Sequence, residues 1–396
     1  MLLMTKTGDR LLAAELAPAT HDEQARQGFV SALRRHVMMA LAEEMRATWE
    51  HQLAPQFERT HGRPPENGHE VRRVMRRQPI YRVWSALRYN AQEMTWASVL
   101  PQIERHLPAL RDAASSAQKS ARGSLRLDPT LELPREYTAL DIHLMPGSFH
   151  TESTPDDVRQ GALYELGTAV FGGGLQLRRR GAVGLSVAHT LRIAHPEFTP
   201  RRILDLGCTV GANTLPYAEV YPDAEIHGID LGAPQLRFAL ARAEASGHAI
   251  HFSQQNAEAT DFSDGYFDLI VSSFFLHEIP TASTRRVFRE AYRLLAPGGL
   301  MLHMELPPAA AVDPYYNFYL DWDAYHNNEP HYAEFRRQDF AALCTEAGFP
   351  RERFVQRRIG NWTISDPEHF AAIARGEIEA PPHGNGASWF VFGAWK

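Results

Sequence analysis

The stretch Arg201-Arg-Ile-Leu-Asp205-Leu-Gly207-Cys-Thr-Val-Gly211-Ala-Asn213 decides the fold of this chain. A short apolar run meets an acid at Asp205, two glycines follow, and a helical stretch leads to a second apolar run that ends at Asp230. This order of strand, glycine turn, helix and strand places both acids at the carboxyl edge of a parallel sheet, where nucleosides bind. We therefore expect Asp230 to accept hydrogen bonds from ribose hydroxyls and Gly207 to permit the sharp turn.

Further landmarks follow the glycine turn in a fixed order. Gln255-Asn256-Ala257 comes after the third expected strand, Phe267-Asp268 lies in the fourth, and Pro297-Gly298-Gly299 precedes the fifth. Together with Asp205-Leu-Gly207-x-x-x-Gly211, this series resembles the class I S-adenosylmethionine (SAM) dependent methyltransferases over residues 201–396. The chain departs from that family at Asn256, where the family usually has an acid that contacts the adenine amino group.

The resemblance implies an α/β fold, namely a Rossmann-like seven-stranded methyltransferase sheet, preceded here by an all-helical N-terminal domain. It also implies SAM as the cofactor and S-adenosylhomocysteine (SAH) as its product. The expected strands span 202–206, 225–230, 249–253, 267–272, 299–305, 353–359 and 388–395, and the last is antiparallel and inserted beside the sixth in the family. The residues expected to bind the cofactor are Asp205, Gly207, Cys208, Gly211, Asp230, Leu231, Asn256, Ala257 and Ser273.

Candidate catalytic residues follow the fourth expected strand. His277 is the first candidate for a general base, because an acceptor hydroxyl or activated carbon must lose a proton and imidazole titrates near neutral pH. A positioning role beneath SAM or a helix cap is the alternative for this histidine. Glu278 is adjacent, and Tyr316 is a third candidate from the aromatic region further along the chain.

An aromatic and polar segment, residues 307–335, falls between the fifth expected strand and the next helix. We expect it to be a substrate lid, because an apolar pocket needs aromatic walls with a few orienting polar groups. A domain or dimer interface would use the same aromatic residues and is the alternative. Candidate substrate-binding residues are His143, His150, Tyr325 and His326. No short His-x-x-x-His or cysteine pair is present, so no metal is expected.

The chain divides by composition into three parts. Residues 1–125 show apolar positions every three or four residues and are expected to be helical, with a role in shaping the pocket or in dimerisation. Residues 126–200 are expected to connect the domains and to contribute to the lid, with one helix starting at Thr154-Pro155 and a chain break at Gly172–Gly174. Residues 201–396 are the expected SAM-binding domain.

Charge and composition limit the possible partners. The net charge of −6 disfavours nucleic acid, which needs a basic surface, and the chain lacks an Asn/Asp-Pro-Pro-Tyr motif after the fourth strand. No apolar stretch approaches the ~20 residues of a membrane span, and Met1–Arg10 lacks the core of a signal peptide. The two cysteines suggest no disulfide framework, which fits a reducing cytoplasm. A homodimer through the helical domain is a further expectation.

The leading hypothesis is a SAM-dependent methyltransferase that acts on oxygen or carbon of a small organic molecule of the natural-product type. The alternative is a SAM-binding protein of the same fold that catalyses a reaction without methyl transfer, as a cyclase or pericyclase does, or that serves a regulatory role.

Overall fold

The computed structural model describes residues 12–171, 181–384 and 386–396. One mixed sheet carries the strand order β1-β4-β3-β2-β5-β6-β8-β7. Its strands are β1 (Ser124–Arg126), β2 (Arg202–Leu206), β3 (Glu225–Asp230), β4 (Ile250–Gln254), β5 (Phe267–Ser273), β6 (Leu295–Glu305), β7 (Phe354–Gly360) and β8 (Ser388–Trp395). Strand β8 lies antiparallel between β6 and β7, while the other pairs are parallel. The seven expected strands and the inserted last strand are confirmed.

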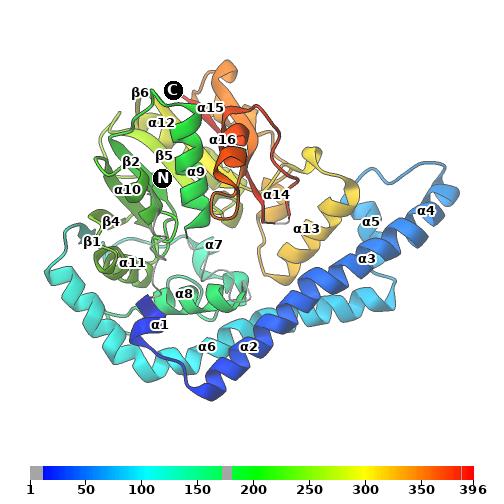
Figure 1. The fold of residues 1–396 in the computed structure, drawn as a ribbon, viewed down its shortest axis with the longest axis horizontal. Coiled ribbons are helices and arrows are strands. Elements are labelled where there is room, and N and C mark those ends of the chain that lie inside the picture. The colour runs from blue at the N-terminus through cyan, green and yellow to red at the C-terminus, as the bar shows by residue number, and fades with distance from the viewer. Residues whose placement is uncertain (1–11, 172–180, 385) are drawn as a thin grey trace.

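Helices cover both faces of the sheet because successive strand side chains point to opposite sides. Ile203 belongs to a core with α9 (Ala182–Ala194), α10 (Leu215–Val220) and α11 (Ala233–Ala245), whereas its neighbour Leu204 belongs to a core with α12 (Thr281–Leu294) and α15 (Phe340–Ala347). Helix α16 (Pro367–Arg375) packs on α9. The sheet is thus a three-layer α/β domain, as Figure 1 shows.

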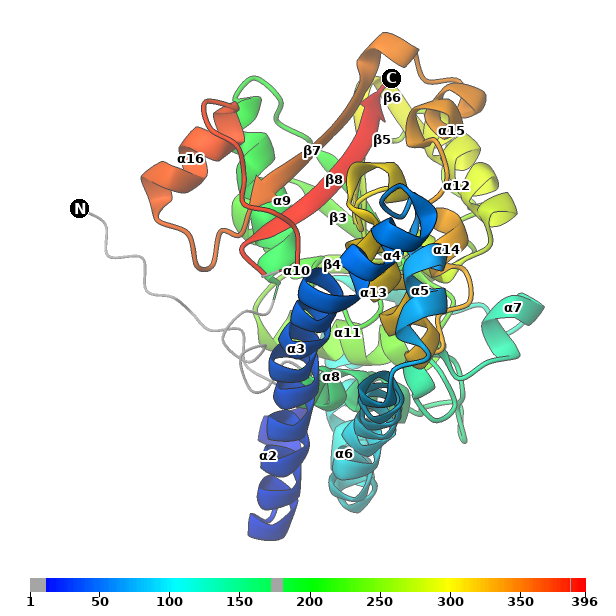
Figure 2. The same cartoon turned by 90° about the vertical axis from the view of Figure 1, so that its right-hand side faces the viewer.

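The N-terminal region forms two long rods that lie side by side in Figures 1 and 2. The first runs through α2 (His21–Arg35), the π-helical segment η1 (His36–Leu41), α3 (Ala42–Thr48), the π-helical segment η2 (Trp49–Leu53) and α4 (Ala54–His61). The second is α6 (Pro79–Lys119), which contains Pro101 and Pro108 and follows the short α5 (Gly68–Met75). The expectation of a helical N-terminal region is confirmed for residues 12–119.

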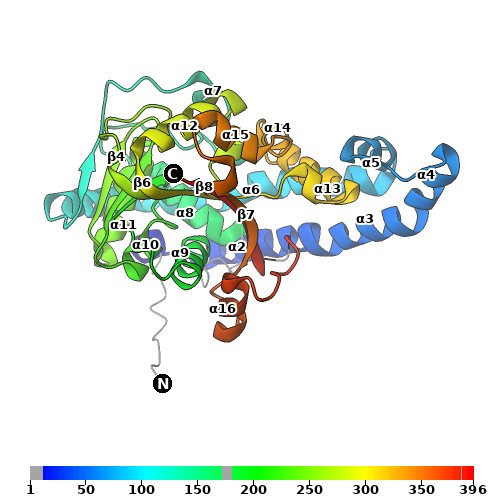
Figure 3. The ribbon, with the colours of Figure 1, turned by 90° about the horizontal axis from the view of Figure 1, so that it is seen from above.

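The rods reach from beneath the sheet to a distal end at α4 and α5 (Figure 3). Near the sheet, α6 packs against α8 (Arg159–Phe171) and α11. Near the distal end, α5 and α6 pack against α13 (Pro314–His326). The helical region therefore touches both the sheet domain and the segment that was expected to be a lid.

Short elements complete the chain. They are α1 (Leu12–Leu16), α7 (Arg135–Thr138), α14 (Tyr332–Phe335) and the 3-10 turns η3 (Ile142–Leu144), η5 (Leu276–Glu278), η6 (Ala309–Ala311) and η7 (Arg351–Arg353). None of the described helices offers a stretch that is both long and apolar enough to cross a bilayer.

Two expectations about residues 112–200 were wrong in detail. The strand β1 was not predicted, because three residues give no periodic signal. The helix expected at Thr154 begins at Arg159, since the Asp157 carboxylate accepts hydrogen bonds from the backbone N–H of Ser153 and of Arg159 and so holds a turn before the helix. The expected break at Gly172–Gly174 lies outside the described residues.

Candidate active site

A cavity of about 570 Å³ opens at the carboxyl ends of β2, β3 and β5. This volume lies in the range of small-molecule sites. Eight of the nine predicted cofactor residues line the cavity: Asp205, Gly207, Cys208, Asp230, Leu231, Asn256, Ala257 and Ser273. Gly211 does not line it and instead sits in the turn with a φ of +72°, close to Leu215 and Phe252.

The turn after β2 has a backbone that only glycine tolerates at its first position. Gly207 has a φ of +67°, and a Cβ built there would lie 2.6 Å from the ring of Phe275. A side chain would therefore meet both backbone strain and a steric clash. Thr209 also has a positive φ, of 45°, and its backbone N–H donates to the Asp230 carboxylate at 3.0 Å.

The two acids of the turn have different surroundings. Asp230 accepts hydrogen bonds from the backbone N–H groups of Thr209 and of Gly232, at 2.8 Å for the latter, and lines the cavity. Asp205 lies deeper and accepts from the Thr214 hydroxyl at 2.6 Å. Burial raises the pKa of Asp205 to about 7 and also raises the pKa of Asp230.

These residues fit the nucleoside end of SAM. The Asp230 carboxylate has acceptor capacity beyond its two backbone donors, since two oxygens offer about four lone-pair sites. Gly207, Cys208 and Thr209 of the glycine turn line the same cavity as Asp230. Asn256 uses its side-chain oxygen to accept from the backbone N–H of Glu258 at 2.9 Å. Cys208 is a buried thiol whose pKa burial raises well above its ordinary value, so it packs and is not a thiolate.

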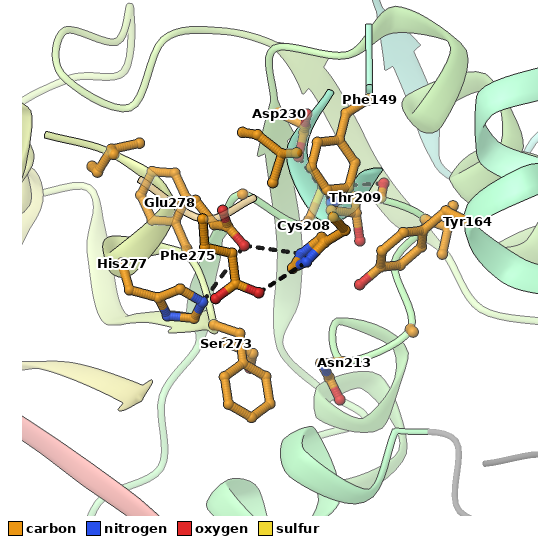
Figure 4. Close-up of a pocket in the computed structure, with 18 of the residues that line it drawn as sticks. Phe149, Tyr164, Cys208, Thr209, Asn213, Asp230, Ser273, Phe275, His277 and Glu278 are labelled. Atoms are coloured by element: carbon orange, nitrogen blue, oxygen red, sulfur yellow. Dashed lines mark hydrogen bonds and ion pairs between the residues drawn. The ribbon is translucent and has the colours of Figure 1, made fainter. Parts of the chain in front are cut away.

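At its other end, the cavity is lined by two histidines and two glutamates. The His277 ring and the Glu278 carboxylate follow β5 and point into the pocket, while Asp230 and Thr209 lie on its other side in Figure 4. His277 Nδ1 lies 2.6 Å from an oxygen of the fully buried Glu305, and His277 Nε2 lies 3.5 Å from Glu278 Oε1. Glu329 completes this group from the segment after α13.

His143 bridges the two glutamates. Its Nε2 lies 3.0 Å from Glu278 Oε1, and its Nδ1 lies 3.0 Å from Glu329 Oε1 and 2.8 Å from the side-chain nitrogen of Asn327. His143 and Glu278 were both predicted as site residues from parts of the sequence separated by more than a hundred positions, and the structure brings them into contact. Glu329 and Asn327 were not predicted, because no local sequence pattern distinguishes them from the other polar residues in the segment 307–335.

The charges of this group shift together. Burial alone would lower the pKa of His143, but Glu278 and Glu329 outweigh it and raise the pKa to about 10. In the same way, Glu305 and Glu278 overcome burial and hold the pKa of His277 well above its ordinary value. Burial would raise the pKa of Glu278, yet His143 and His277 lower it. The neighbouring charges therefore favour the protonated forms of His143 and His277 and the ionised form of Glu278.

The helical rod holds the loop that carries His143. Trp96 Nε1 and Gln92 Nε2 of α6 donate to the backbone carbonyl of His143 at 2.7 and 2.8 Å. His143 and the next residue, Leu144, have φ values of 57° and 54°. Such left-handed conformations cost about 1–3 kcal/mol each and persist only where the surroundings enforce them. The N-terminal domain thus positions a residue of the site.

Five of the predicted site residues lie outside the cavity lining. The cavity lining does not include Tyr316, His150, Tyr325 or His326. The Tyr316 hydroxyl lies 2.8 Å from His383 Nδ1, and both residues line a separate pocket on the surface. The Tyr325 side chain is 67% exposed. Tyr316 and Tyr325 belong to α13, whose successive side chains point about 100° apart, so only some of them face the cavity. The fifth residue is Gly211, described above.

Residues 307–335 serve two purposes. Tyr315, Phe318 and Trp322 are buried in a core with residues of the N-terminal rods, among them Trp84. This packing is a domain interface, which was the alternative to a substrate lid for residues 307–335. Asp323, Asn327, Glu329 and Tyr332 line the cavity.

Comparison with known families matches residues 203–299 to the family described as methyltransferase domain. The demethylmenaquinone methyltransferase of Thermus thermophilus is 38% identical over 138 residues, which cover 35% of this chain and 57% of the relative. The ajmaline N-methyltransferase of Rauvolfia serpentina is 33% identical over 122 residues, which cover 29% of this chain and 40% of the relative. The chain thus spans about half the length of these curated relatives.

Among solved structures, the phosphoethanolamine N-methyltransferase 2 of Haemonchus contortus, in complex with phosphomonomethylethanolamine and S-adenosylhomocysteine, aligns with a TM-score of 0.38 and 17% identity. The alignment covers 52% of each chain. Residues 203–299 thus match the methyltransferase domain family, and the strand order of the sheet is the one that the resemblance to class I SAM-dependent methyltransferases predicted. The predictions of the family, of the fold class and of SAM as cofactor are confirmed.

Proposed function

We propose that this protein transfers a methyl group from SAM to an oxygen or carbon of a small organic molecule. One observation supports this proposal above the others: a single cavity joins the glycine turn and Asp230 to the cluster of His143, His277 and Glu278. A cofactor held at the first end and an acceptor held at the second would share one space. Apolar surface predominates in the lining, which suits a small organic acceptor.

The proposed reaction asks little chemistry of the protein beyond alignment. When bound, SAM supplies a methyl carbon that the adjoining sulfonium activates toward nucleophiles. Asp230 and the turn at Gly207 would hold the nucleoside, and Ser273 and Phe274 at the end of β5 line the space between the two ends. The chain's task is to hold the acceptor in line and to keep water out. The aromatic side chains of Phe149, Tyr164 and Trp389 contribute to that exclusion.

An acceptor hydroxyl or activated carbon must give up a proton. A His277 whose pKa lies well above its ordinary value carries that proton already at neutral pH and donates rather than accepts. Glu278, whose pKa is lowered, is the unprotonated partner that faces the cavity. The role of His277 as a general base thus stays a prediction, which the neighbouring charges disfavour. Glu278 is the better candidate to accept a hydrogen bond from the hydroxyl group of the methyl acceptor.

Two measurements test the proposed function. Isothermal titration should show SAH binding that Asp230→Ala weakens by at least about 100-fold, because two or more hydrogen bonds to a charged group are each worth about 1.5–3 kcal/mol. The matched control is Asp223→Ala, the same change at an exposed position before β3. SAH binding at full affinity in Asp230→Ala would overturn the site assignment.

The second measurement follows labelled methyl groups from SAM into small-molecule extracts incubated with the protein. Label in an extractable product supports methyl transfer. SAH binding without any labelled product would favour the alternative, a protein of this fold that binds SAM without transferring its methyl group.

We further propose a cytoplasmic protein, with dimerisation through the helical region as an open prediction. Light scattering of the purified chain tests the dimer. A role of the helical region in shaping the pocket is supported by the contacts of Gln92 and Trp96 with the backbone of His143.

A further inference from the structure

We propose that His143, Glu278 and Glu329 form a binding site for one divalent transition-metal ion at the acceptor end of the cavity. Each of these residues offers one ligand atom, and the three atoms lie within 4.8 Å of one another. Imidazole with carboxylates is a donor set that suits Zn²⁺, Mn²⁺ or Fe²⁺. The function suggested for this ion rests on the proposed methyl transfer, whereas its binding does not.

Two side-chain oxygen atoms at the proposed site lack a hydrogen-bond donor. Glu278 Oε2 and Asn327 Oδ1 are buried and have no hydrogen-bond partner within the part of the chain that the structure describes. Asn327 is only 5% exposed, lines the cavity, and contacts His143 Nδ1 through its side-chain nitrogen. Buried acceptors without donors cost about 1–3 kcal/mol each, and a cation in the cavity would satisfy them.

His277 is arranged as histidine ligands of metals are. Its Nδ1 lies 2.6 Å from the buried Glu305 carboxylate, and its Nε2 faces Glu278 at 3.5 Å. A metal-bound histidine characteristically donates its other N–H to a carboxylate, which fixes the ring and strengthens the ligand. His277 therefore holds its ring toward Glu278, one of the three proposed ligands.

Backbone strain concentrates around the proposed site. Six non-glycine residues of the described chain have a positive φ: His143, Leu144, Ser148, Thr209, Phe274 and Asn328. Asn328 lies between two residues of the cluster, and Phe274 precedes the turn that carries Glu278. Strained backbone of this kind is maintained where side chains must be held in place.

The competing explanation is that His143 itself is the cation. The His143 imidazole already lies between Glu278 and Glu329, 3.0 Å from each, where its protonated form would serve as their counter-charge. In that case the cluster is a closed ion-pair network that needs no metal. The two explanations make opposite predictions for removal of the imidazole. A metal ligand that is lost weakens cation binding, whereas a lost counter-charge leaves two facing carboxylates that bind cations more tightly.

The ion would have a defined use in the proposed reaction. A divalent cation acts as a Lewis acid on an oxygen bound to it and makes a hydroxyl or enol group easier to deprotonate. The acceptor class would then be molecules with an oxygen that can reach the ion from the cavity.

The experiment uses the full chain, stripped with a chelator and titrated with MnCl2 and separately with ZnCl2 in the absence of SAM. We expect one equivalent of ion to bind. Glu278→Gln and Glu329→Gln should each weaken binding at least 30-fold, and His143→Ala should weaken it as well. The control Glu334→Gln, the same change at an exposed position outside the cavity, should bind like the wild type.

A second readout is independent of any single variant's folding. Electron spin echo measurements on the Mn²⁺-loaded wild type should show coupling to an imidazole ¹⁴N. Absence of stoichiometric binding of both ions, or absence of ¹⁴N coupling, would overturn the metal site. Tighter cation binding by His143→Ala would establish the counter-charge explanation instead.

The outcome is separable from the proposed function. All four variants should retain SAH binding within about threefold, because their side chains lie away from Asp230 and the glycine turn. A wild type that binds SAH but binds neither ion would reject this inference alone. Loss of SAH binding by the wild type would reject the proposed function and leave the metal result standing.

Discussion

The two ends of the cavity are built in different ways. The cofactor end comes from consecutive pieces of one sheet: the turn after β2, the tip of β3 and the loops after β4 and β5. The acceptor end comes from α6, from the loop around His143, from the turn after β5 and from the segment after α13. The first end depends on local backbone geometry, and the second depends on how distant parts of the chain pack. Substitutions at the two ends should therefore affect SAH binding and methyl transfer differently.

The largest effect is expected from Gly207→Ala. A methyl group there would clash with Phe275 and would add about 1–2 kcal/mol of strain at a positive φ. SAH binding should fall more than about 100-fold by isothermal titration, since the turn must move. Binding of Mn²⁺ at the acceptor end should persist.

Gly298→Ala is the control for strain alone. Gly298 also has a positive φ, of 80°, but a Cβ there would meet nothing within 4 Å. This variant should lose about 1 kcal/mol of stability and keep SAH affinity. Equal losses of SAH affinity in both variants would show that general destabilisation, and not the turn, explains the result.

The next effect concerns charge at the cofactor end. The pKa of Asp205 is about 7 in the folded chain because of burial, against an ordinary value of 3.8. Between these values the folded state binds a proton that the unfolded state has lost, so stability falls as pH rises from about 4 to 7. Asp205→Asn should remove a change of about 4 kcal/mol in the free energy of unfolding across that range, measured by urea unfolding.

Asp223→Asn provides the comparison for this slope, because it makes the same change in an exposed turn. Its unfolding should follow the pH dependence of the wild type. An unchanged slope in Asp205→Asn would mean that this carboxyl is ionised in the folded protein at pH 5–6.

A smaller effect should distinguish the acceptor end. Gln92→Leu removes a donor to the His143 carbonyl and an acceptor for Arg34 and Arg88. We expect methyl transfer to fall roughly 10- to 30-fold, about 1.4–2 kcal/mol, because the loop loses its support. SAH affinity should stay within about twofold. Steady-state kinetics together with SAH titration would measure both.

Asn90→Leu changes an exposed amide on the same helix, whose side-chain nitrogen donates to the backbone carbonyl of Ala86 in its own helix. Its kinetics should match the wild type. A Gln92→Leu variant that lost SAH affinity as strongly as activity would contradict the independence of the two ends.

The smallest effect is expected at Tyr325. The sequence analysis predicted that Tyr325 binds substrate, but its side chain is 67% exposed and lies outside the cavity lining. Tyr325→Ala should change activity less than twofold and stability by less than about 0.5 kcal/mol. A tenfold loss of activity would mean that α13 moves over the cavity during the reaction.

The same contrast explains what the sequence could predict. The strands around Asp205 and Asp230 follow from apolar runs bounded by turns, and eight of nine expected cofactor residues line the cavity because a parallel sheet brings strand ends to one edge. His143 and Glu278 were nominated separately, yet nothing in the spacing could show that they touch. Glu329 and Asn327 were missed, and Tyr316 and Tyr325 were misplaced, because a helix of uncertain rotation decides which side chains face inward.

The amide of Gln92 joins three parts of the chain at one point. Its oxygen accepts from Arg34 of the first rod and from Arg88, which also pairs with Asp323 of α13 at 2.6 Å, while its nitrogen holds the His143 loop. Arg88 and Asp323 alone are separated by 235 positions. Contacts between such distant residues form only after long loops have closed. The acceptor end should consequently be the last part of the protein to become ordered during folding, after the sheet and its cofactor turn.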